Sequence, residues 1–141
     1  MIDSIRVAQY ADFPALRQLF LEARQHLFAH LANPQFLLDD FDRQTTGEHI
    51  LLACDMDKQL LGFIAVFEPE SFIHHLYIAP RAQRRGVGTK LLAALPGWGE
   101  RNHQLKCLKN NERALVFYQS CQFQIVGEGS GEDGDYWLLQ H

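Results

Sequence analysis

Two glycines follow a basic run in the segment Gln83-Arg84-Arg85-Gly86-Val87-Gly88, which comes shortly after an apolar stretch ending at Ile78. Residues 73–92 together predict a strand, a basic turn and the start of a helix. A glycine lets the backbone approach a ligand closely, and the first N–H groups of a helix have no partner inside it. These groups and the positive end of the helix dipole attract anions. The turn is therefore a predicted anion site, and phosphate is the most plausible anion.

Two generic phosphate motifs do not match this turn. Leu91 stands where a dinucleotide-binding fingerprint has its third glycine, and Gly88 is followed by Thr89-Lys90 rather than by the P-loop order of lysine and then a hydroxyl residue. Positive charge is concentrated around the turn, at Arg81, Arg84, Arg85 and Lys90. The whole chain has a net charge of −4, so we expect a local anionic ligand and no nucleic acid.

The turn resembles the acyl-CoA signature of the GNAT superfamily of N-acetyltransferases, [Q/R]-x-x-G-x-[G/A], which Gln83 to Gly88 match. The preceding Leu76-Tyr77-Ile78-Ala79-Pro80 is similar to the strand end of that family. A second family element, N-x-x-A-x-x-F-Y, is matched by residues 111–118, at the spacing of one helix and one strand. A six-residue pattern alone has little specificity, but the two elements together are specific.

The resemblance covers essentially the whole chain and implies an α/β (α+β) fold: a splayed, mixed, mostly antiparallel sheet of about seven strands flanked by about four helices. It implies one acetyltransferase domain over residues 1–141 and acetyl-CoA as cosubstrate. By the same resemblance, the pantetheine arm would pair with the backbone of one strand, and the turn would hold the pyrophosphate. The cofactor-binding residues so implied are Leu76, Tyr77, Ile78, Gln83, Arg84, Arg85, Gly86, Val87, Gly88, Thr89 and Asn111.

An amine acceptor has to lose a proton before or during its attack on a thioester. A lysine-like amine with a pKa of ~10.4 is neutral in about one molecule in a few thousand at pH 7, which costs roughly 4–5 kcal/mol, so a general base is valuable. His74 is the first candidate, because many family members have a glutamate at the matching position and because imidazole titrates near neutral pH. His75 is the second, and Glu68, Glu70 or a water chain are alternatives. In a regular strand His74 would share a face with Phe72, Leu76 and Ile78.

The departing thiolate has to gain a proton, and Tyr118 resembles the general acid of the family. The alternative for Tyr118 is a core tyrosine that only packs. Asn111 would contact the pantetheine or a water, and it can also cap the helix that follows. One departure from the family pattern is Gln122-Phe123 in place of Gly-Phe, which predicts a differently formed helix end.

The remaining segments supply the elements that this resemblance requires. We expect a strand over residues 2–7, a helix after Asp12 with Pro14 in its first turn, and a second helix opened by Asn33-Pro34 that ends by Gly47. The first helix is expected to expose Arg24, and the two helices are a candidate lid. Further expected elements are strands at 50–54, 60–67, 72–78, 105–108, 123–126 and 135–139, a short helix that stops near Pro96, and a loop at 127–134.

The composition fits this interpretation. The chain has 141 residues with 47% hydrophobic and 21% charged content, which is typical of one globular domain. No signal peptide or membrane span is apparent, so a cytoplasmic protein is expected. His26 and His30 lie four residues apart without a third ligand, so no metal site is expected. The partner is a small-molecule or peptide amine, and an exposed sheet edge makes a homodimer reasonable. The alternative function is a CoA-binding sensor without turnover.

Overall fold

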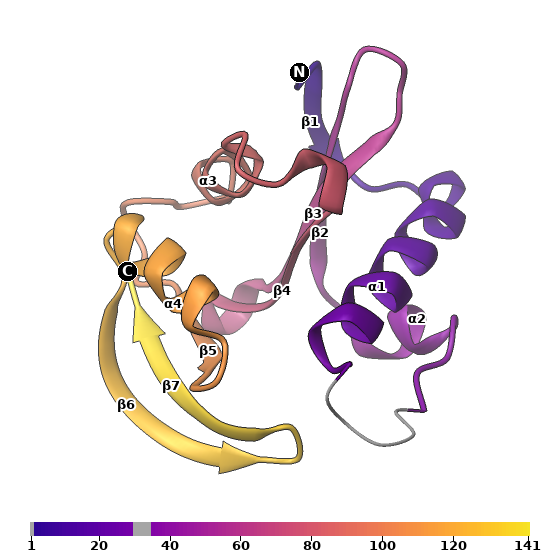
Figure 1. The fold of residues 1–141 in the computed structure, drawn as a ribbon. Helices are drawn as coiled ribbons and strands as arrows, with labels where there is room; N and C mark the ends of the chain where they lie inside the picture. Colours follow the sequence, from indigo (N-terminus) through magenta and orange to yellow (C-terminus); the bar gives the residue numbers. More distant parts are fainter. Residues whose placement is uncertain (1, 30–34) are drawn as a thin grey trace.

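The computed structural model describes residues 2–29 and 35–141 and shows a seven-stranded sheet with helices on both sides (Figure 1). The strands are β1 (Ser4–Val7), β2 (His49–Cys54), β3 (Leu60–Phe67), β4 (Phe72–Ile78), β5 (Gln104–Leu108), β6 (Gln124–Gly131) and β7 (Gly134–Gln140). The α-helices of the described part are α1 (Phe13–Leu27), α2 (Asp40–Gln44), α3 (Val87–Ala93) and α4 (Glu112–Ser120). Short 3-10 turns lie at Tyr10–Asp12, Glu68–Glu70 and Pro80–Ala82.

The sheet has the order β1-β2-β3-β4-β5-β7-β6, and every neighbouring pair is antiparallel except β4 with β5. The parallel pair is held only where Phe72 lies opposite Gln104 and Ile73 lies opposite Leu105. Beyond these two positions the strands diverge, and the two halves of the sheet turn away from each other (Figure 1). The predicted splayed, mixed sheet is confirmed.

The core lies on both faces of the β2–β3–β4 half. On one face Phe20 of α1 and Phe41 of α2 pack edge-on against Phe63 of β3, with ring centroids 6.2 and 5.4 Å apart. On the opposite face lies α3, whose Val87 and Leu91 are fully buried (Figure 1). The helices therefore hold β4 firmly against β3 and leave its other edge open beyond Ile73.

Arg24 corrects one expectation, because it is buried and not on the exposed side of α1. Its guanidinium lies over the rings of Phe20 and Phe36, 4.0 and 4.6 Å from their centroids, and pairs with buried Asp40 at 3.1 Å. The Asp40 carboxylate also accepts the Leu37 N–H at 2.8 Å. A long side chain at an apolar helix position can thus bury its charge when a carboxylate and the faces of aromatic rings lie beside it.

The end of α4 corrects a second expectation. Gln122 takes the left-handed conformation (φ 74°) that the family gives to glycine. The Phe123 N–H donates to Tyr118 O and the Gln122 N–H to Gln119 O, both at 3.0 Å. These two bonds are the Schellman arrangement, so the helix end is formed in the usual way with a strained residue in place of glycine.

The hairpin of β6 and β7 corrects a third expectation, because both strands continue through most of the segment 127–134 that was predicted to be a loop. Pairing runs to Gly131 opposite Gly134, which leaves only Glu132 and Asp133 as the turn. At Gly129 an added Cβ would lie 2.5 Å from the Tyr136 hydroxyl, so the ring of Tyr136 covers the glycine. An aromatic residue opposite a glycine stabilises such a strand pair and offsets the low strand propensity of glycine.

The second helix of the described part is shorter than predicted and spans only Asp40–Gln44. The predicted start of that helix at Asn33-Pro34, and His30 of the histidine pair, lie outside the described residues. Among the described residues no helix is long and apolar enough to cross a membrane.

Candidate active site

The glycine turn between β4 and α3 has the backbone geometry of an anion cradle. Arg84 (φ 62°) and Gly86 (φ 79°) are both in the left-handed region. The first helical bond is donated by the Lys90 N–H to Gly86 O at 3.1 Å. Within the described part of the chain, no hydrogen-bond acceptor binds the N–H groups of residues 84–89. A run of free N–H groups in such a turn is suited to phosphate oxygens.

The two sequence motifs meet in space at this turn. A Cβ atom on Gly88 would lie 2.9 Å from Cζ of Phe117, so the second glycine is required for α3 to lie this close to α4. One residue further, the Thr89 hydroxyl lies 3.8 Å from the Cys121 sulfur. The glycine turn is therefore fixed beside the residue that precedes Tyr118.

The basic cluster divides into structural and exposed members. Arg81 donates to Leu60 O at 2.8 Å and lies 3.5 Å from Asp55, so it fastens the turn to the β2–β3 connection. Gln83 donates to Ile78 O at 3.0 Å and fixes the end of β4. Arg84 and Arg85 are exposed, as is Lys90 one helical turn on, and their charge is available to a ligand.

The open edge of β4 faces the gap left by the divergence of β5. The Ala79 N–H donates to Leu61 O of β3 at 2.8 Å. Because the peptide groups of a strand alternate in direction, those of Leu76 and Ile78 point into the gap, and those of Tyr77 point to β3. Gln83 binds Ile78 O from that side, as this alternation requires. Of the three predicted β4 positions, Leu76 offers its N–H and C=O to an extended ligand and Ile78 offers its N–H, while the Tyr77 ring packs against Phe20 (5.4 Å).

Tyr118 of α4 lies close enough to Cys107 of β5 and Tyr77 of β4 for both to act on its phenol, so the hydroxyl is near both strands that border the gap. Its ring contacts Phe117 and Phe123, with centroids 5.3 and 5.4 Å apart. Burial raises the pKa of the Tyr118 phenol well above its usual value, and nearby Cys107 and Tyr77 add to this effect. No hydrogen-bond partner of the hydroxyl is found among the described residues. The hydroxyl is thus a protonated donor that is free to serve a ligand.

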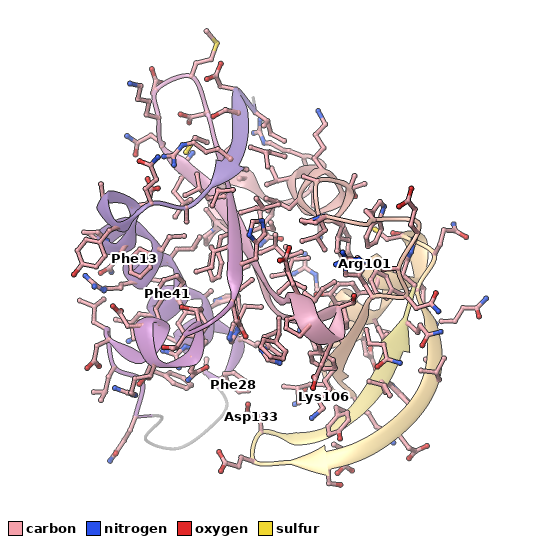
Figure 2. The ribbon with its side chains drawn as sticks, turned by 180° about the vertical axis from the view of Figure 1, so that it is seen from behind. Phe13, Phe28, Phe41, Arg101, Lys106 and Asp133 are labelled. Atoms are coloured by element: carbon pink, nitrogen blue, oxygen red, sulfur yellow. The ribbon has the colours of Figure 1, made fainter. Side chains whose placement is uncertain are left out.

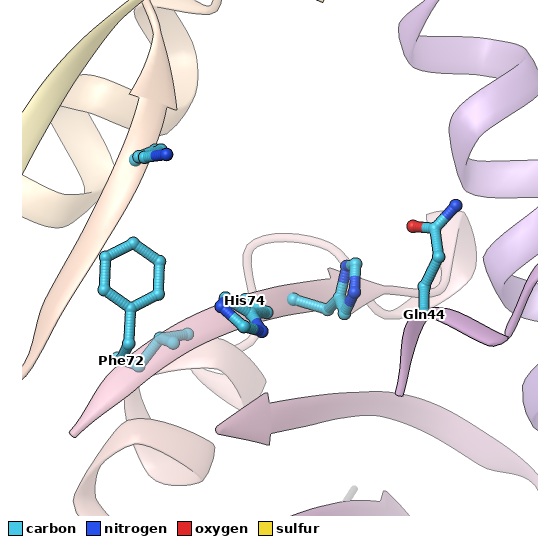
Figure 3. Close-up of a pocket in the computed structure, with 6 residues that line it drawn as sticks. Gln44, Phe72 and His74 are labelled. Carbon is cyan, nitrogen blue, oxygen red and sulfur yellow. The ribbon is translucent and has the colours of Figure 1, made fainter. Parts of the chain in front are cut away.

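A β-bulge in β4 changes how the two histidines are placed. Ala65 lies opposite His75 and Val66 lies opposite Ile73, so His74 is an extra residue without a direct partner. The bulge interrupts the alternation and gives His74 surroundings different from those expected beside Leu76 and Ile78. Both histidines line one open pocket of about 350 Å³. Its lining is Gln44, Phe72, Ile73, His74, His75 and Lys106, and Figure 3 shows Phe72, His74 and Gln44 around it.

The two histidines differ in environment. His75 packs against Phe20 of α1 (5.0 Å), and the backbone of Gln44 in α2 lies near enough to act on its pKa. Burial lowers the pKa of His75 to about 4, and the neighbouring His74 adds to this. The His74 side chain keeps 40% of its surface exposed, and its Nδ1 contacts the Glu48 carboxylate. At neutral pH His75 is neutral and mostly enclosed, whereas His74 is open to the pocket.

Asn111 caps α4, because its side-chain oxygen accepts the Ala114 N–H at 3.2 Å. Its amide NH₂ donates to no acceptor among the described residues and remains as a donor. Among the described residues there is no group of three or more histidine, cysteine, aspartate or glutamate side chains that could hold a metal ion.

A family model described as "Acetyltransferase (GNAT) family" matches residues 13–123, which is most of the chain. The chain belongs to the GNAT family of acetyltransferases. It is therefore an N-acetyltransferase of the GNAT type, and the identification covers α1 to α4, including the glycine turn and Tyr118.

Relatives of this GNAT chain include a peptidyl-lysine N-acetyltransferase, YiaC, of Escherichia coli (strain K12), 29% identical over 86% of this chain and 84% of the relative. Among solved structures, yncA of Salmonella typhimurium, a putative acetyltransferase with its cofactor acetyl-CoA, is similar with a TM-score of 0.72 and 19% identity, covering 100% of this chain and 93% of that one. The spermidine N-acetyltransferase of Vibrio cholerae in complex with CoA and spermine has a TM-score of 0.72 and 18% identity, covering 98% of this chain and 94% of that one.

Sequence reasoning missed two residues of this GNAT site. Glu48 gave no signal, because it follows Gly47 in a polar stretch and its link to His74 spans 26 positions. Lys106 lines the pocket from β5, and its ammonium also lies 4.8 Å from the centre of the Tyr136 ring. Figure 2 shows Lys106 and Asp133 toward the same end of the molecule. The negative charge of Asp133 acts to raise the pKa of Arg24 and of Tyr77, which lie in the other half of the sheet and its helices. The alternation of polar and apolar residues in β5 could have indicated that Lys106 points out of the core.

Proposed function

We propose that residues 1–141 form one domain that transfers an acetyl group from acetyl-CoA to a primary amine by direct attack, with a lysine side chain of a peptide as the preferred acceptor. The observation that carries the proposal is the placement of the free N–H groups of residues 84–89, the open β4 edge and the Tyr118 hydroxyl along one gap. Acetyl-CoA would supply the activated thioester.

The turn would hold the pyrophosphate through its N–H groups, and Arg84, Arg85 and Lys90 would add positive charge. Leu76 and Ile78 would pair with the pantetheine arm through their peptide groups, and the Asn111 amide would donate a further hydrogen bond.

Other residues of the predicted site shape the turn and would not bind the cofactor through their side chains. Gly86 allows the positive φ of the turn, and Gly88 leaves room for the ring of Phe117. Val87 is buried and Gln83 binds Ile78 O, so these two act by holding the turn.

His74 would act as general base, removing a proton from the acceptor amine directly or through a water. The exposure of its ring to the pocket supports this role, whereas the enclosed His75 is better suited to joining β4 to α2. The Leu76 N–H would donate to the carbonyl oxygen as negative charge develops on it. Tyr118 would then give its proton to the departing thiolate. A raised phenol pKa supports this role, because the proton is present throughout the neutral range.

A lysine peptide is favoured over a polyamine by the lining of the pocket. The lining residues include no carboxylate and include the cationic Lys106. A polycation would meet positive charge there, while a peptide presents one amine through an open mouth. The relation to a peptidyl-lysine N-acetyltransferase also supports this acceptor class.

The experiment follows free thiol released from acetyl-CoA on addition of a lysine peptide, an N-terminal amine peptide or spermidine. We expect acceptor-dependent release, fastest with the lysine peptide. Binding of acetyl-CoA with no acceptor-dependent release across a broad amine panel would instead support a CoA-binding sensor. Faster release with spermidine would contradict the proposed acceptor class and leave the transferase intact.

A further inference from the structure

Glu48 is a buried carboxylate that the mechanism above leaves unused. It lies directly before β2, and its side chain is only 3% exposed. One carboxylate oxygen contacts Nδ1 of His74, and the other, Oε1, is buried without a hydrogen-bond partner in the described structure. A charged group is rarely buried unless a partner compensates for its lost hydration, and here that partner is His74. The contact between this buried carboxylate and the solvent-exposed imidazole of His74 is therefore a candidate for a functional role.

The geometry also fixes the orientation of the imidazole. The His74 ring is stacked parallel to Phe67 at 6.4 Å, with an interplanar angle of 3°, and lies 5.0 Å from the ring of Phe72. With Nδ1 engaged by the carboxylate, the neutral ring carries its proton on Nδ1. Nε2 then keeps its lone pair, which is the form of histidine that can accept a proton from a substrate.

We propose that Glu48 is the positioning residue for His74: its carboxylate holds the Nδ1–H tautomer, leaves Nε2 as the base and stabilises the imidazolium once the proton is taken. This inference rests on the proposed function, in which His74 is the base. The bulge in β4 leaves His74 without a direct partner on β3, and its Nδ1 contacts Glu48, the residue directly before β2.

The other charged groups around His74 do not supply this effect. His75, the adjacent residue on β4, is neutral because burial lowers its pKa to about 4. Lys106, from β5, lines the same pocket and its positive charge opposes an imidazolium. Gln44 of α2 is uncharged. Burial raises the pKa of Glu48, and its contact with His74 acts in the opposite direction. Among the described residues, the carboxylate that contacts the His74 ring is that of Glu48.

The direct test is an NMR titration of the full chain that follows the ring nitrogens of His74. In the wild-type protein we expect the neutral ring to carry its proton on Nδ1. Glu48→Gln keeps the side-chain volume and removes the charge, and its amide can either accept from Nδ1 or donate to it, so the neutral ring should no longer be held in one tautomer. Glu100→Gln makes the same change at an exposed position outside the pocket and should leave the His74 tautomer as it is in the wild type. A wild-type neutral ring protonated on Nε2, or an unchanged tautomer in the Glu48 variant, would overturn the proposal.

Kinetics separate this inference from the proposed function. If both hold, Glu48→Gln lowers kcat and moves the acidic limb of the pH–rate curve to lower pH, and it adds no further loss in a His74→Ala background. If the tautomer changes but the pH–rate curve does not move, the pair exists and His74 is not the base. If Glu48→Gln does not fold, Glu48→Asp, which keeps the charge and shortens the reach, should weaken the preference for the Nδ1–H tautomer, and no change there contradicts the proposal.

Discussion

At the scale of single residues, Tyr118 is the group whose role can be separated most clearly from packing. Tyr118→Phe keeps the ring contacts with Phe117 and Phe123 and removes only the hydroxyl. We expect kcat to fall by about 10²–10⁴-fold because the thiolate loses its proton donor, while the affinity for acetyl-CoA stays similar. Steady-state kinetics and a binding titration measure the two quantities. The exposed Tyr10 offers the matched control, Tyr10→Phe, and unchanged turnover in the Tyr118 variant would assign Tyr118 to packing alone.

His75 makes a prediction about stability rather than turnover. Its pKa is about 4 in the folded chain and ~6.5 in the unfolded chain, so only the unfolded state takes up this proton between these values. The free energy of unfolding should therefore be greatest above pH ~6.5 and should fall as the pH drops toward 4, by up to about 3 kcal/mol from this group.

Urea unfolding at about pH 7 and about pH 5 measures this slope. His75→Gln should reduce the difference between the two conditions, because glutamine takes up no proton. The exposed His26, changed in the same way, should leave the difference as it is in the wild type. An equal pH dependence in the wild type and in the His75 variant would contradict the assignment.

At the scale of elements, the end of α4 carries strain that a single substitution can release. Gln122 has a φ of 74°, which is unfavourable for a residue with a Cβ and free of penalty for glycine. Gln122→Gly should raise the free energy of unfolding by about 1 kcal/mol, since the Schellman bonds of Gln122 and Phe123 are made by the backbone. Gln119→Gly, the same change inside the helix, should lower it by about 1 kcal/mol. Thermal or urea unfolding of both variants measures the two changes in the free energy of unfolding. A lower free energy of unfolding in the Gln122→Gly variant would contradict the strain assigned to Gln122.

The elements also show which features the sequence could predict. Apolar periodicity, Pro14 near the start of α1 and Pro96 after α3 predicted the order of helices and strands, because these signals are local. The bulge at His74 and the length of the β6–β7 hairpin could not be predicted in this way. They depend on which residue of a neighbouring strand lies opposite, as Ala65 and Tyr136 do, and this partner is set by tertiary packing.

The same limit applies to the candidate site. Its cofactor side could be predicted because Gln83 to Gly88 and Asn111 to Tyr118 are contiguous motifs whose residues act largely through the backbone. The acceptor side could not, because Glu48, His74 and Lys106 come from three different strands or their ends and meet only in the folded chain. Burial of Arg24 was missed for a similar reason, since its partner Asp40 is 16 residues away.

At the scale of the whole molecule, the divergence of β4 from β5 creates the opening that joins the cofactor side of the candidate site to its acceptor side. Two paired positions, Phe72 with Gln104 and Ile73 with Leu105, hold the halves of the sheet together, and everything proposed for the ligand lies in the opening beyond them. The glycine turn stands at one end of that opening and the pocket with His74 at the other. The sheet therefore sets the distance between phosphate binding and chemistry.

A crystal structure of the chain with CoA bound would test this account most directly. We expect the pantetheine arm to lie between β4 and β5, with hydrogen bonds to the peptide groups of Leu76 and Ile78. The pyrophosphate should accept N–H bonds from residues 84–89, and the sulfur should lie within hydrogen-bond reach of the Tyr118 hydroxyl. CoA bound elsewhere, or a pantetheine sulfur directed away from Tyr118 and His74, would contradict the proposed cofactor site between β4 and β5.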